Sequence, residues 1–377
     1  MSLLDARRVG RGLAAALLLC AMGLAACTTG RPADPARTQA ASHHAPGGGF
    51  RNPAGSPTWQ PDTFDFVRFI ARRFTADDQP DRILPEGFAV PHGQALAQLQ
   101  AASNPSLTWI GHSTFLIRVG GLKILTDPFF SDRASPVGFA GPERLVPPGI
   151  GIDELPDIDA IVISHNHYDH FDIRSLERIA KRSPNARVLV PMGLADYVRR
   201  AGLQNVREMD WYETDDMGGV SFVSTPAIHR SNRGLFDVNQ TLWTGWAIKA
   251  PDLRIWFAGD TGFGPVFERE VAPRVGPVDV ALVPAGAFLP RDILRPVHVT
   301  PEEGLELARI MGAKMAIAMH WGTLPLGADL PKDAVRQFMG HHVPGLEKVM
   351  MRIGETRNFE RHPLSASYRA EAQAPRR

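Results

Sequence analysis

The sequence has little cysteine, no excess charge of one sign and no long hydrophobic run. Its only cysteines are Cys20 and Cys27, so no disulfide framework can stabilise the rest of the chain. The 41 Lys and Arg residues nearly balance the 40 Asp and Glu residues, which leaves a net charge of +1. A nucleic-acid-binding protein usually has an excess of basic residues that contact phosphates, so this balance disfavours nucleic-acid binding. With 44% hydrophobic residues the chain has an ordinary globular composition, and disorder throughout is excluded.

The N-terminal segment has the features of an export signal. Arg7, Arg8 and Arg11 precede an apolar run, Leu13 to Ala26, which is shorter than the roughly 20 residues needed to cross a bilayer. We therefore expect residues 1–26 to be a cleaved signal peptide. Leu24-Ala25-Ala26-Cys27 resembles the bacterial lipobox, whose cysteine is acylated and becomes the first mature residue. The resemblance implies a membrane-attached lipoprotein of the bacterial cell envelope, with the outer membrane facing the periplasm favoured. The alternative is a plain signal peptide.

The remaining chain divides by composition into a tether, one folded unit and a tail. Residues 27–57 are rich in small and polar residues and are predicted to form a disordered tether. Residues 58–363 are expected to form a single folded unit, and residues 364–377 are expected to form a flexible tail. Within the unit, residues 64–74 combine Phe and Arg in a short amphipathic stretch. That stretch suits either anionic lipid headgroups or docking onto the domain, and both interpretations stay open.

Short β-rich segments and helical segments alternate along the folded unit. Three segments split by Gly and His, Leu107–Ile110, Thr114–Ile117 and Lys123–Thr126, predict an antiparallel meander. Later apolar runs, typical of strands buried on both faces, are 160–163, 187–190, 220–223, 254–257, 280–283 and 315–318. Helical patterns lie between them at 173–182 and 301–311, the latter opened by Thr300 as N-cap. This order predicts an α/β sandwich of two mixed sheets flanked by helices.

A cluster of potential metal ligands follows the predicted strand at 160–163. His165, His167, Asp169 and His170 lie within six residues. In an extended segment His165 and His167 share one side and can bind one ion, while a turn at Asp169 and His170 can direct two more ligands to a neighbouring site. The cluster therefore predicts a metal centre.

Three later strands also end at residues that bind metals. The strand at 220–223 leads to His229, that at 254–257 to Asp260, and that at 315–318 to His320. Active sites of α/β folds gather at the carboxyl ends of strands, so we expect these side chains to join the cluster. Seven nitrogen and oxygen ligands without cysteine suit two borderline metal ions, most plausibly zinc, with one bridging carboxylate.

This pattern resembles the metallo-β-lactamase superfamily, and within it the branch that contains N-acyl-phosphatidylethanolamine-hydrolysing phospholipase D. The resemblance extends over nearly the whole folded unit. The segments that carry it are Trp109–Thr114, Leu125–Pro128, Ser131–Pro136, Ser164–Asp172, Phe257–Gly262, His298–Glu303 and His320–Thr323.

The resemblance implies an assignment of the ligands. One Zn²⁺ is held by His165, His167 and His229, the other by Asp169, His170 and His320, and Asp260 bridges the two ions. Asp169 is also placed to orient the attacking hydroxide, which makes it a catalytic residue as well as a ligand. Two zinc ions per chain suit hydrolysis by metal-bound hydroxide, because they acidify a shared water and clamp phosphoryl oxygens.

Several histidines and one aspartate outside the ligand set were also considered for a role. In the resembling family a histidine at the position of His298 lies beside the substrate phosphate, which implies a catalytic role in stabilising charge or protonating the leaving alkoxide. Asp127 is either an acceptor for the second nitrogen of a histidine ligand or a turn cap before Pro128. His112 is expected to be a structural residue. No role is predicted for His43, His44, His341, His342 and His362.

These observations predict a dizinc phosphodiesterase of phospholipase D type that acts on N-acylphosphatidylethanolamine-like phospholipids. One alternative is a metal-dependent lactonase or other ester hydrolase, since the same chemistry attacks carbonyl groups. A second is a noncatalytic zinc-binding envelope lipoprotein, which the complete ligand set disfavours. The expected partners are a phospholipid or other phosphodiester substrate and a membrane surface reached through acylated Cys27, not a nucleic acid.

Overall fold

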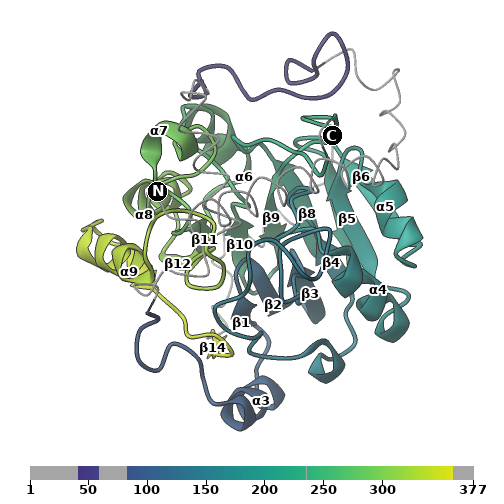
Figure 1. Cartoon of the computed structure of the whole chain (residues 1–377), viewed down its shortest axis with the longest axis vertical. Coiled ribbons are helices and arrows are strands. Elements are labelled where there is room, and N and C mark those ends of the chain that lie inside the picture. Colours follow the sequence, from purple (N-terminus) through teal and green to yellow (C-terminus); the bar gives the residue numbers. More distant parts are fainter. Residues whose placement is uncertain (1–40, 59–82, 235, 360–377) are drawn as a thin grey trace, which may run out of the picture.

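The computed structural model describes residues 41–58, 83–234 and 236–359 (Figure 1). Several predictions concern residues outside these ranges. They are the signal peptide at 1–26, acylation of Cys27, the amphipathic stretch at 64–74 and the tail at 364–377. These four remain predictions.

The first sheet joins the predicted meander to a parallel half. Its described strands, in spatial order, are β14 (Thr356–Asn358), β1 (Ser106–Gly111), β2 (Thr114–Val119), β3 (Leu122–Thr126), β4 (Ala160–Val162), β5 (Arg187–Pro191) and β6 (Val206–Met209). β1, β2 and β3 pair in antiparallel register, which confirms the meander. From β3 to β6 all neighbours are parallel, so these strands end at the same edge of the sheet.

The second sheet is also mixed. Its described strands, in spatial order, are β13 (Glu347–Val349), β12 (Met315–Met319), β11 (Val280–Pro284), β10 (Arg254–Phe257), β9 (Gly245–Lys249), β8 (Val220–Thr225) and β7 (Thr214–Met217). β9 is antiparallel to both β8 and β10, so β8 and β10 run in the same direction. β10 to β13 are parallel. As a result β8, β10 and β12 end on one side.

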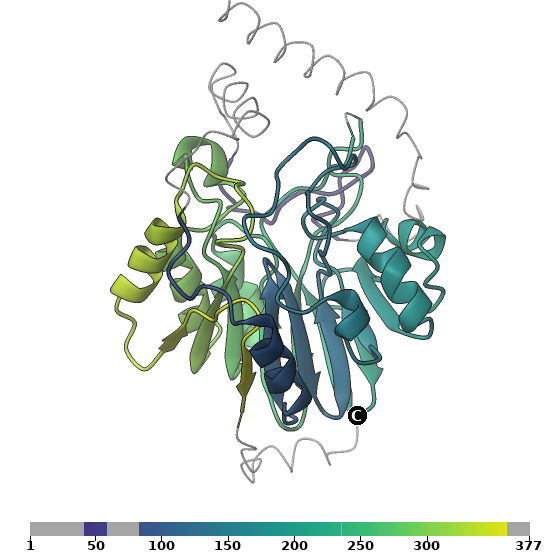
Figure 2. The ribbon, with the colours of Figure 1, turned by 60° about the horizontal axis from the view of Figure 1, so that its bottom comes forward.

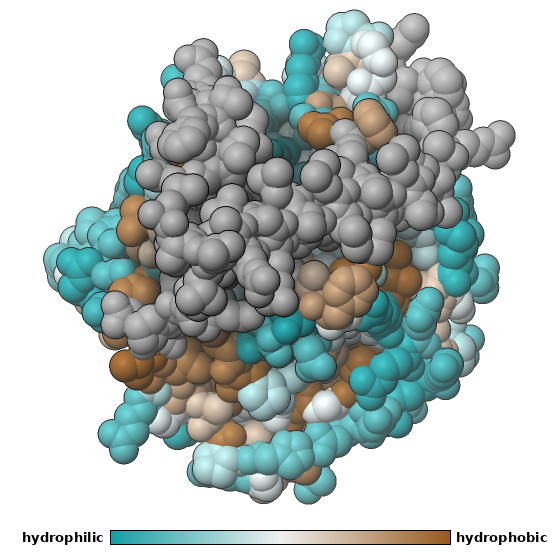
Figure 3. All heavy atoms as spheres, in the orientation of Figure 1, coloured by the Kyte–Doolittle hydropathy of each residue, from teal (hydrophilic) through white to brown (hydrophobic). Residues whose placement is uncertain are grey.

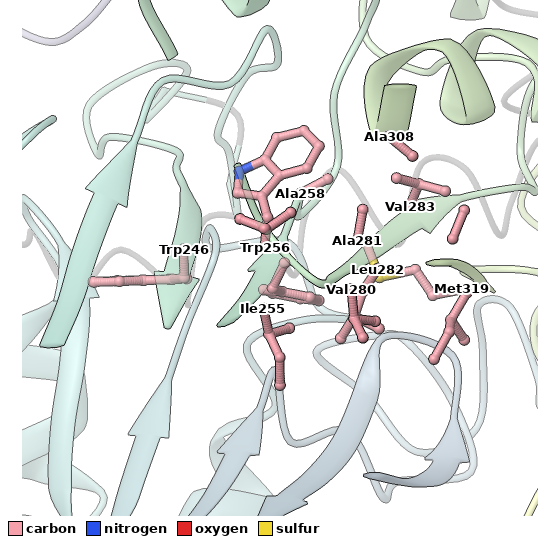
Figure 4. Close-up of a cluster of buried hydrophobic side chains, with 14 of the residues drawn as sticks. Trp246, Ile255, Trp256, Ala258, Val280, Ala281, Leu282, Val283, Ala308 and Met319 are labelled. Atoms are coloured by element: carbon pink, nitrogen blue, oxygen red, sulfur yellow. The ribbon is translucent and has the colours of Figure 1, made fainter. Parts of the chain in front are cut away.

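The two sheets pack face to face over one apolar core. Trp109 of β1 and Trp256 of β10 belong to the same buried cluster, which therefore spans both sheets. Figure 4 shows Trp246, Trp256 and Leu282 on the adjacent strands β9, β10 and β11. All three side chains are fully buried, and such burial contributes about 1.5–3 kcal/mol for a side chain of the size of leucine.

Helices cover the outer faces of the sheets, and this layering confirms the predicted sandwich (Figure 2). On the first sheet, α3 (His92–Gln100), α4 (Ile173–Arg182) and α5 (Ala195–Arg200) bury apolar side chains against the strands. On the second sheet, α8 (Pro301–Ile310) contacts β11 and β12, and α9 (Pro331–Gly340) packs beside α8. Shorter elements are η2 (Ile152–Glu154), the π-helical turn η3 (Phe267–Val271), α6 (Ala272–Val275) and α7 (Arg291–Leu294).

Part of the predicted tether is packed onto the domain, which corrects the prediction of disorder for residues 41–57. Phe50 is buried in a small cluster with Trp211 and Trp243, and its N–H donates to the carbonyl of Asn239 (2.8 Å). The segment lies at the same end of the molecule as the loops that follow the strands (Figure 2). The prediction of disorder rested on the average composition of residues 27–57. One phenylalanine and a few long-range hydrogen bonds are enough to hold a short segment in place, and an average does not reveal them.

Polar and apolar residues are unevenly distributed over the described surface. In the space-filling view the margin that carries α4 and α5 is predominantly hydrophilic (Figure 3). The large hydrophobic side chains that are exposed are Ile83, Phe139, Phe236, Val238 and Met339. Among the described residues, the structure contains no helix with the length and apolarity needed to cross a bilayer.

Candidate metal centre

The loop that follows β4 carries four of the predicted ligands. It bends at a turn in which the N–H groups of His170 and Phe171 both donate to the carbonyl of His167 (3.1 and 2.8 Å). The guanidinium of Arg233 donates to the carbonyls of Asn166 and Phe171 (2.7 and 2.8 Å). Hydrogen bonds from one half-buried arginine therefore hold both ends of the turn.

The fold brings the three distant predicted ligands to this loop. His229 follows β8, Asp260 follows β10 and His320 follows β12. Gly259, which precedes Asp260, has a φ of +61°, and a Cβ atom there would lie only 2.8 Å from the Cβ of Ser164. Glycine thus permits the end of β10 to approach the loop closely. The seven predicted ligands lie together at one edge of the two sheets.

The side chains form two neighbouring groups. In the first, the Nε2 atom of His165 lies 2.8 Å from the Nδ1 atom of His167, and Nε2 of His229 lies 3.2 Å from the same atom. In the second, Oδ2 of Asp169 lies 3.3 Å from Nε2 of His170 and 3.4 Å from Nε2 of His320. Each group brings its ligand atoms close enough to hold one ion.

Asp260 lies between the two groups. Its Oδ2 atom is 3.2 Å from Nε2 of His170, 3.1 Å from Nε2 of His320 and 3.9 Å from Nε2 of His229. Its carboxylate thus contacts members of both groups. This position is the one that a bridging ligand requires.

The residues present fit a pair of divalent cations. Nε2 of His170, Nε2 of His320 and Oδ1 of Asp260 are buried and have no hydrogen-bond partner. An unpaired buried polar atom is costly, and metal coordination satisfies it. Imidazole nitrogens with carboxylate oxygens are the donors that zinc and related borderline metals accept.

The charges at the site favour cations. Burial lowers the pKa of His165 and His167 well below the usual range of histidine, and that of His229 to about 4, so these rings are neutral and have a nitrogen lone pair to offer. Burial acts in the same direction on His170 and His320, but the carboxylates of Asp260 and Asp169 outweigh it. They raise the pKa of His170 well above its usual range and that of His320 to about 9. The two carboxylates thus attract positive charge, which divalent cations would supply.

Outer hydrogen bonds orient the histidines. Oδ2 of Asp127 accepts from Nδ1 of His170 (2.7 Å) and from Oγ of Ser164 (2.5 Å), and Oδ1 accepts from the Ser164 N–H (2.6 Å). Of the two interpretations of Asp127, the structure shows the acceptor for a histidine, the predicted ligand His170. Nδ1 of His229 similarly donates to the carbonyl of Val297 (2.9 Å). Such contacts present the opposite nitrogen to a metal.

His298 lies at the site and is not one of the seven predicted ligands, although its ligand atom lies within 4.8 Å of those of His229 and Asp260. Its Nδ1 atom is 3.9 Å from Oδ2 of Asp260, and it has no hydrogen-bond partner. Two hydrogen bonds hold its backbone, and in one of them its N–H donates to the carbonyl of Leu294 (2.7 Å). The guanidinium of Arg291 donates to the His298 carbonyl (2.8 Å) and to both oxygens of Glu303 (3.0 and 2.8 Å). Glu303 in turn forms a capping box with Thr300, the predicted N-cap of α8.

His112 is a site residue that the sequence analysis assigned only to structure. Its Nε2–H donates to Oδ2 of Asp169 (3.0 Å), and its ring lies 4.1 Å from that of His320. Burial lowers its pKa to about 3, so the ring is neutral. The available signal was its place in the turn between β1, which ends at the site, and β2, which begins there. The left-handed backbone of His112, φ 53°, which turns the ring inward, is visible only in the structure.

The chain is similar to several known proteins. Residues 123–321, just over half of the 377-residue chain, match the family described as beta-lactamase superfamily domain. The chain is 33% identical to "N-acyl-phosphatidylethanolamine-hydrolyzing phospholipase D 1" of Caenorhabditis elegans, over 77% of this chain and 86% of that protein. It is also 33% identical to the mitochondrial protein of the same description in Saccharomyces cerevisiae, over 74% of this chain but only 59% of the yeast protein.

A solved structure shares the fold. It is "a possible metal-dependent hydrolase" from Veillonella parvula, which superposes with a TM-score of 0.56 and 19% identity, over 68% of this chain and 100% of that one. At this identity the likeness concerns the fold alone.

Proposed function

The chain belongs to the metallo-β-lactamase superfamily, as a metal-dependent hydrolase, and we propose that it is a dizinc phosphodiesterase of phospholipase D type. Its proposed substrate is an N-acylphosphatidylethanolamine or a similar phospholipid, the class named in the description of the nematode relative. The observation that carries the proposal is the position of His298. It lies beside Asp260, its Nδ1 atom has no hydrogen-bond partner, and neither of the two ligand groups needs it to be complete, so we infer that its ring is available to the substrate.

The proposed metal ligands are the two groups described above. His165, His167 and His229 would hold one zinc ion, Asp169, His170 and His320 the other, and Asp260 both. Zinc in such a pair lowers the pKa of water toward neutrality and attracts the phosphoryl oxygens of a diester.

Asp169 and His298 act on opposite sides of the scissile bond in this proposal. Asp169 is oriented by the hydrogen bond from Nε2 of His112 (3.0 Å), and its carboxylate orients the attacking water by accepting a hydrogen bond from it. Burial lowers the pKa of His298 well below its usual range, so the neutral ring has one N–H to donate. That N–H stabilises the charge that develops as the bond from phosphorus to the alkoxide breaks.

The test is a hydrolysis panel, resolved by mass spectrometry, that compares the wild type with His298→Ala. We expect phospholipid turnover to fall about 10²- to 10⁴-fold while zinc content stays near two ions per chain. The loss should be smaller with a nitrophenyl phosphodiester, because nitrophenolate needs little assistance to leave. The exposed His341→Ala is the matched control and should retain full activity.

Three results would contradict the proposal. Phospholipid cleavage by His298→Ala at the wild-type rate would show that His298 does not assist departure of the alkoxide. Activity on lactones with none on phosphodiesters would establish the alternative ester hydrolase. Full zinc occupancy with no turnover of any substrate would establish a noncatalytic zinc-binding protein.

Membrane attachment completes the proposal. We propose that Cys27 is acylated and that the enzyme works at a membrane of the cell envelope, with the outer membrane favoured. The lipobox-like sequence Leu24–Cys27 supports acylation. Attachment to a membrane would also place the enzyme next to its proposed phospholipid substrate.

A further inference from the structure

A second cluster of histidines and a carboxylate lies outside the metal centre. His43 and His44 come from the N-terminal segment 41–58, and Asp210 directly follows β6. Nε2 of His43 is 2.6 Å from Oδ1 of Asp210, and Nε2 of His44 is 2.8 Å from Oδ2. The ligand atoms of all three residues lie within 4.8 Å of one another. Two chain segments that are remote in sequence thus place two nitrogens and a carboxylate together.

The two rings are arranged like the histidine pairs of the main centre. The ring centroids of His43 and His44 are 4.5 Å apart with an interplanar angle of 79°. The corresponding values are 4.5 Å and 81° for His165 with His167, and 4.6 Å and 78° for His165 with His229. The short distances from His43 and His44 to Asp210 also have a counterpart in the main centre. There, Nε2 of His165 and Nδ1 of His167 are only 2.8 Å apart.

The surroundings hold the three side chains in place. The ring of His43 stacks on Trp211 at 4.0 Å, and that of His44 meets the edge of Phe50 at 5.1 Å. The backbone N–H of Trp211 donates to Oδ1 of Asp210 (2.8 Å) and orients the carboxylate. The imidazoles are nearly buried, with 9% and 1% of their side-chain surface exposed, while Asp210 is 20% exposed. Water can therefore reach the carboxylate and occupy a fourth coordination position.

We propose that His43, His44 and Asp210 form a separate binding site for a zinc-like divalent cation. The donor set of two imidazoles, one carboxylate and a water suits a tetrahedral borderline metal. The ion would join the segment 41–58 to the end of β6. Zinc sites that connect remote segments contribute their binding free energy to local folding.

The site bears on the main centre through the segment that it holds. Oδ1 of Asn52 in this segment accepts from the backbone N–H of His229 (2.9 Å), which is a proposed ligand. The ion would thus keep the N-terminal segment against one edge of the main centre. The competing interpretation is that the imidazoles donate directly to the carboxylate with no ion between them.

Glutamine substitution separates these two interpretations. In the double variant His43→Gln, His44→Gln the amide groups still donate hydrogen bonds to Asp210, but they are poor zinc ligands. The full chain is stripped with a chelator, reloaded with zinc and dialysed, and zinc is counted by mass spectrometry. We expect the double variant to bind one ion fewer per chain than the wild type. His92→Gln is the matched control, because exposed His92 also pairs with a carboxylate, Glu154, at 2.8 Å and should not change the count.

A second variant, Asp210→Asn, removes the carboxylate and should lose the same ion. Because the measured quantity is a difference in ion count, it does not depend on whether the main centre hydrolyses phospholipid. An unchanged count in either folded variant overturns the proposal. Should both variants fail to fold, native mass spectra of the wild type decide, since more than two zinc ions per chain support the site and two or fewer overturn it.

Discussion

Replacing Asp127 by asparagine tests how outer contacts control the metal centre. Asp127 is completely buried and accepts three hydrogen bonds, from Nδ1 of His170, from Oγ of Ser164 and from the Ser164 N–H. Its backbone has a φ of 32°, a left-handed conformation that asparagine tolerates as well as aspartate does. The variant therefore changes the hydrogen bonding and the charge while the chain path is retained.

Either orientation of the new amide is unfavourable. If the NH₂ group faces His170, it donates to Nδ1 and moves the ring proton to Nε2, the atom that faces Asp169 and Asp260. That nitrogen then has no lone pair for a metal. If the NH₂ group faces Ser164 instead, it meets the backbone N–H, and two donors oppose each other in a buried place. Loss of such an outer contact lowers metal affinity by about 10- to 100-fold, or about 1.4–2.7 kcal/mol.

The assay is a zinc titration of the folded protein against a chromophoric chelator. Asp127→Asn should lower the affinity for one of the two zinc ions, the one near His170, by about 10- to 100-fold. Asp252→Asn is the matched control, because Asp252 also accepts a backbone hydrogen bond, from Gly120 (3.0 Å), but lies outside the centre. Zinc affinity within twofold of the wild type in Asp127→Asn would refute the reasoning.

The other predictions concern the bridge, an ion pair and the N-terminus. Asp260→Ala should lower zinc content at both positions, since Asp260 contacts both groups, and metal analysis that shows loss of only one ion would contradict this. Burial by itself would raise the pKa of Asp215, but hydrogen bonds from Arg187 and Arg207 hold that pKa below its usual range. The Asp215 carboxylate therefore stabilises the fold above about pH 4, and this stabilisation is lost as the pH falls through the folded pKa. Asp215→Asn should therefore lower the free energy of unfolding in urea by about 1 kcal/mol at pH 7, with a difference that shrinks below pH 4 and does not grow there. Cys27→Ala should move the protein from the membrane to the soluble fraction, and an unmodified wild-type protein found wholly in the soluble fraction would refute acylation.

The fold and the candidate ligands were largely predictable because their signals are local. Apolar runs such as 280–283 identify buried strands by length and composition alone, and the structure contains a strand there, β11. The loop His165–His170 has its ligands within a few residues. Its approach to His229, Asp260 and His320 follows from a general rule, that the strands before them end on one side.

The residues that escaped prediction depend on contacts between remote segments. Nothing near His43 or His44 in sequence indicates Asp210, which is more than 160 residues away. The local composition of residues 27–57 instead predicted disorder for the whole segment. His112 was assigned to structure because its neighbours are apolar strands, and its contact with Asp169 depends on the closure of a loop 57 residues further along.

The sequence by itself determined the layered architecture and the kind of chemistry, since strand periodicity and ligand type are properties of short segments. Only the tertiary structure decided which nitrogen of each histidine faces the centre, that Asp127 orients His170, that His298 lies beside Asp260, and that the segment 41–58 is packed. Those features depend on the directions of hydrogen bonds between residues far apart in the chain. Directions of this kind exist only once the sheets have packed and water has been excluded from between them.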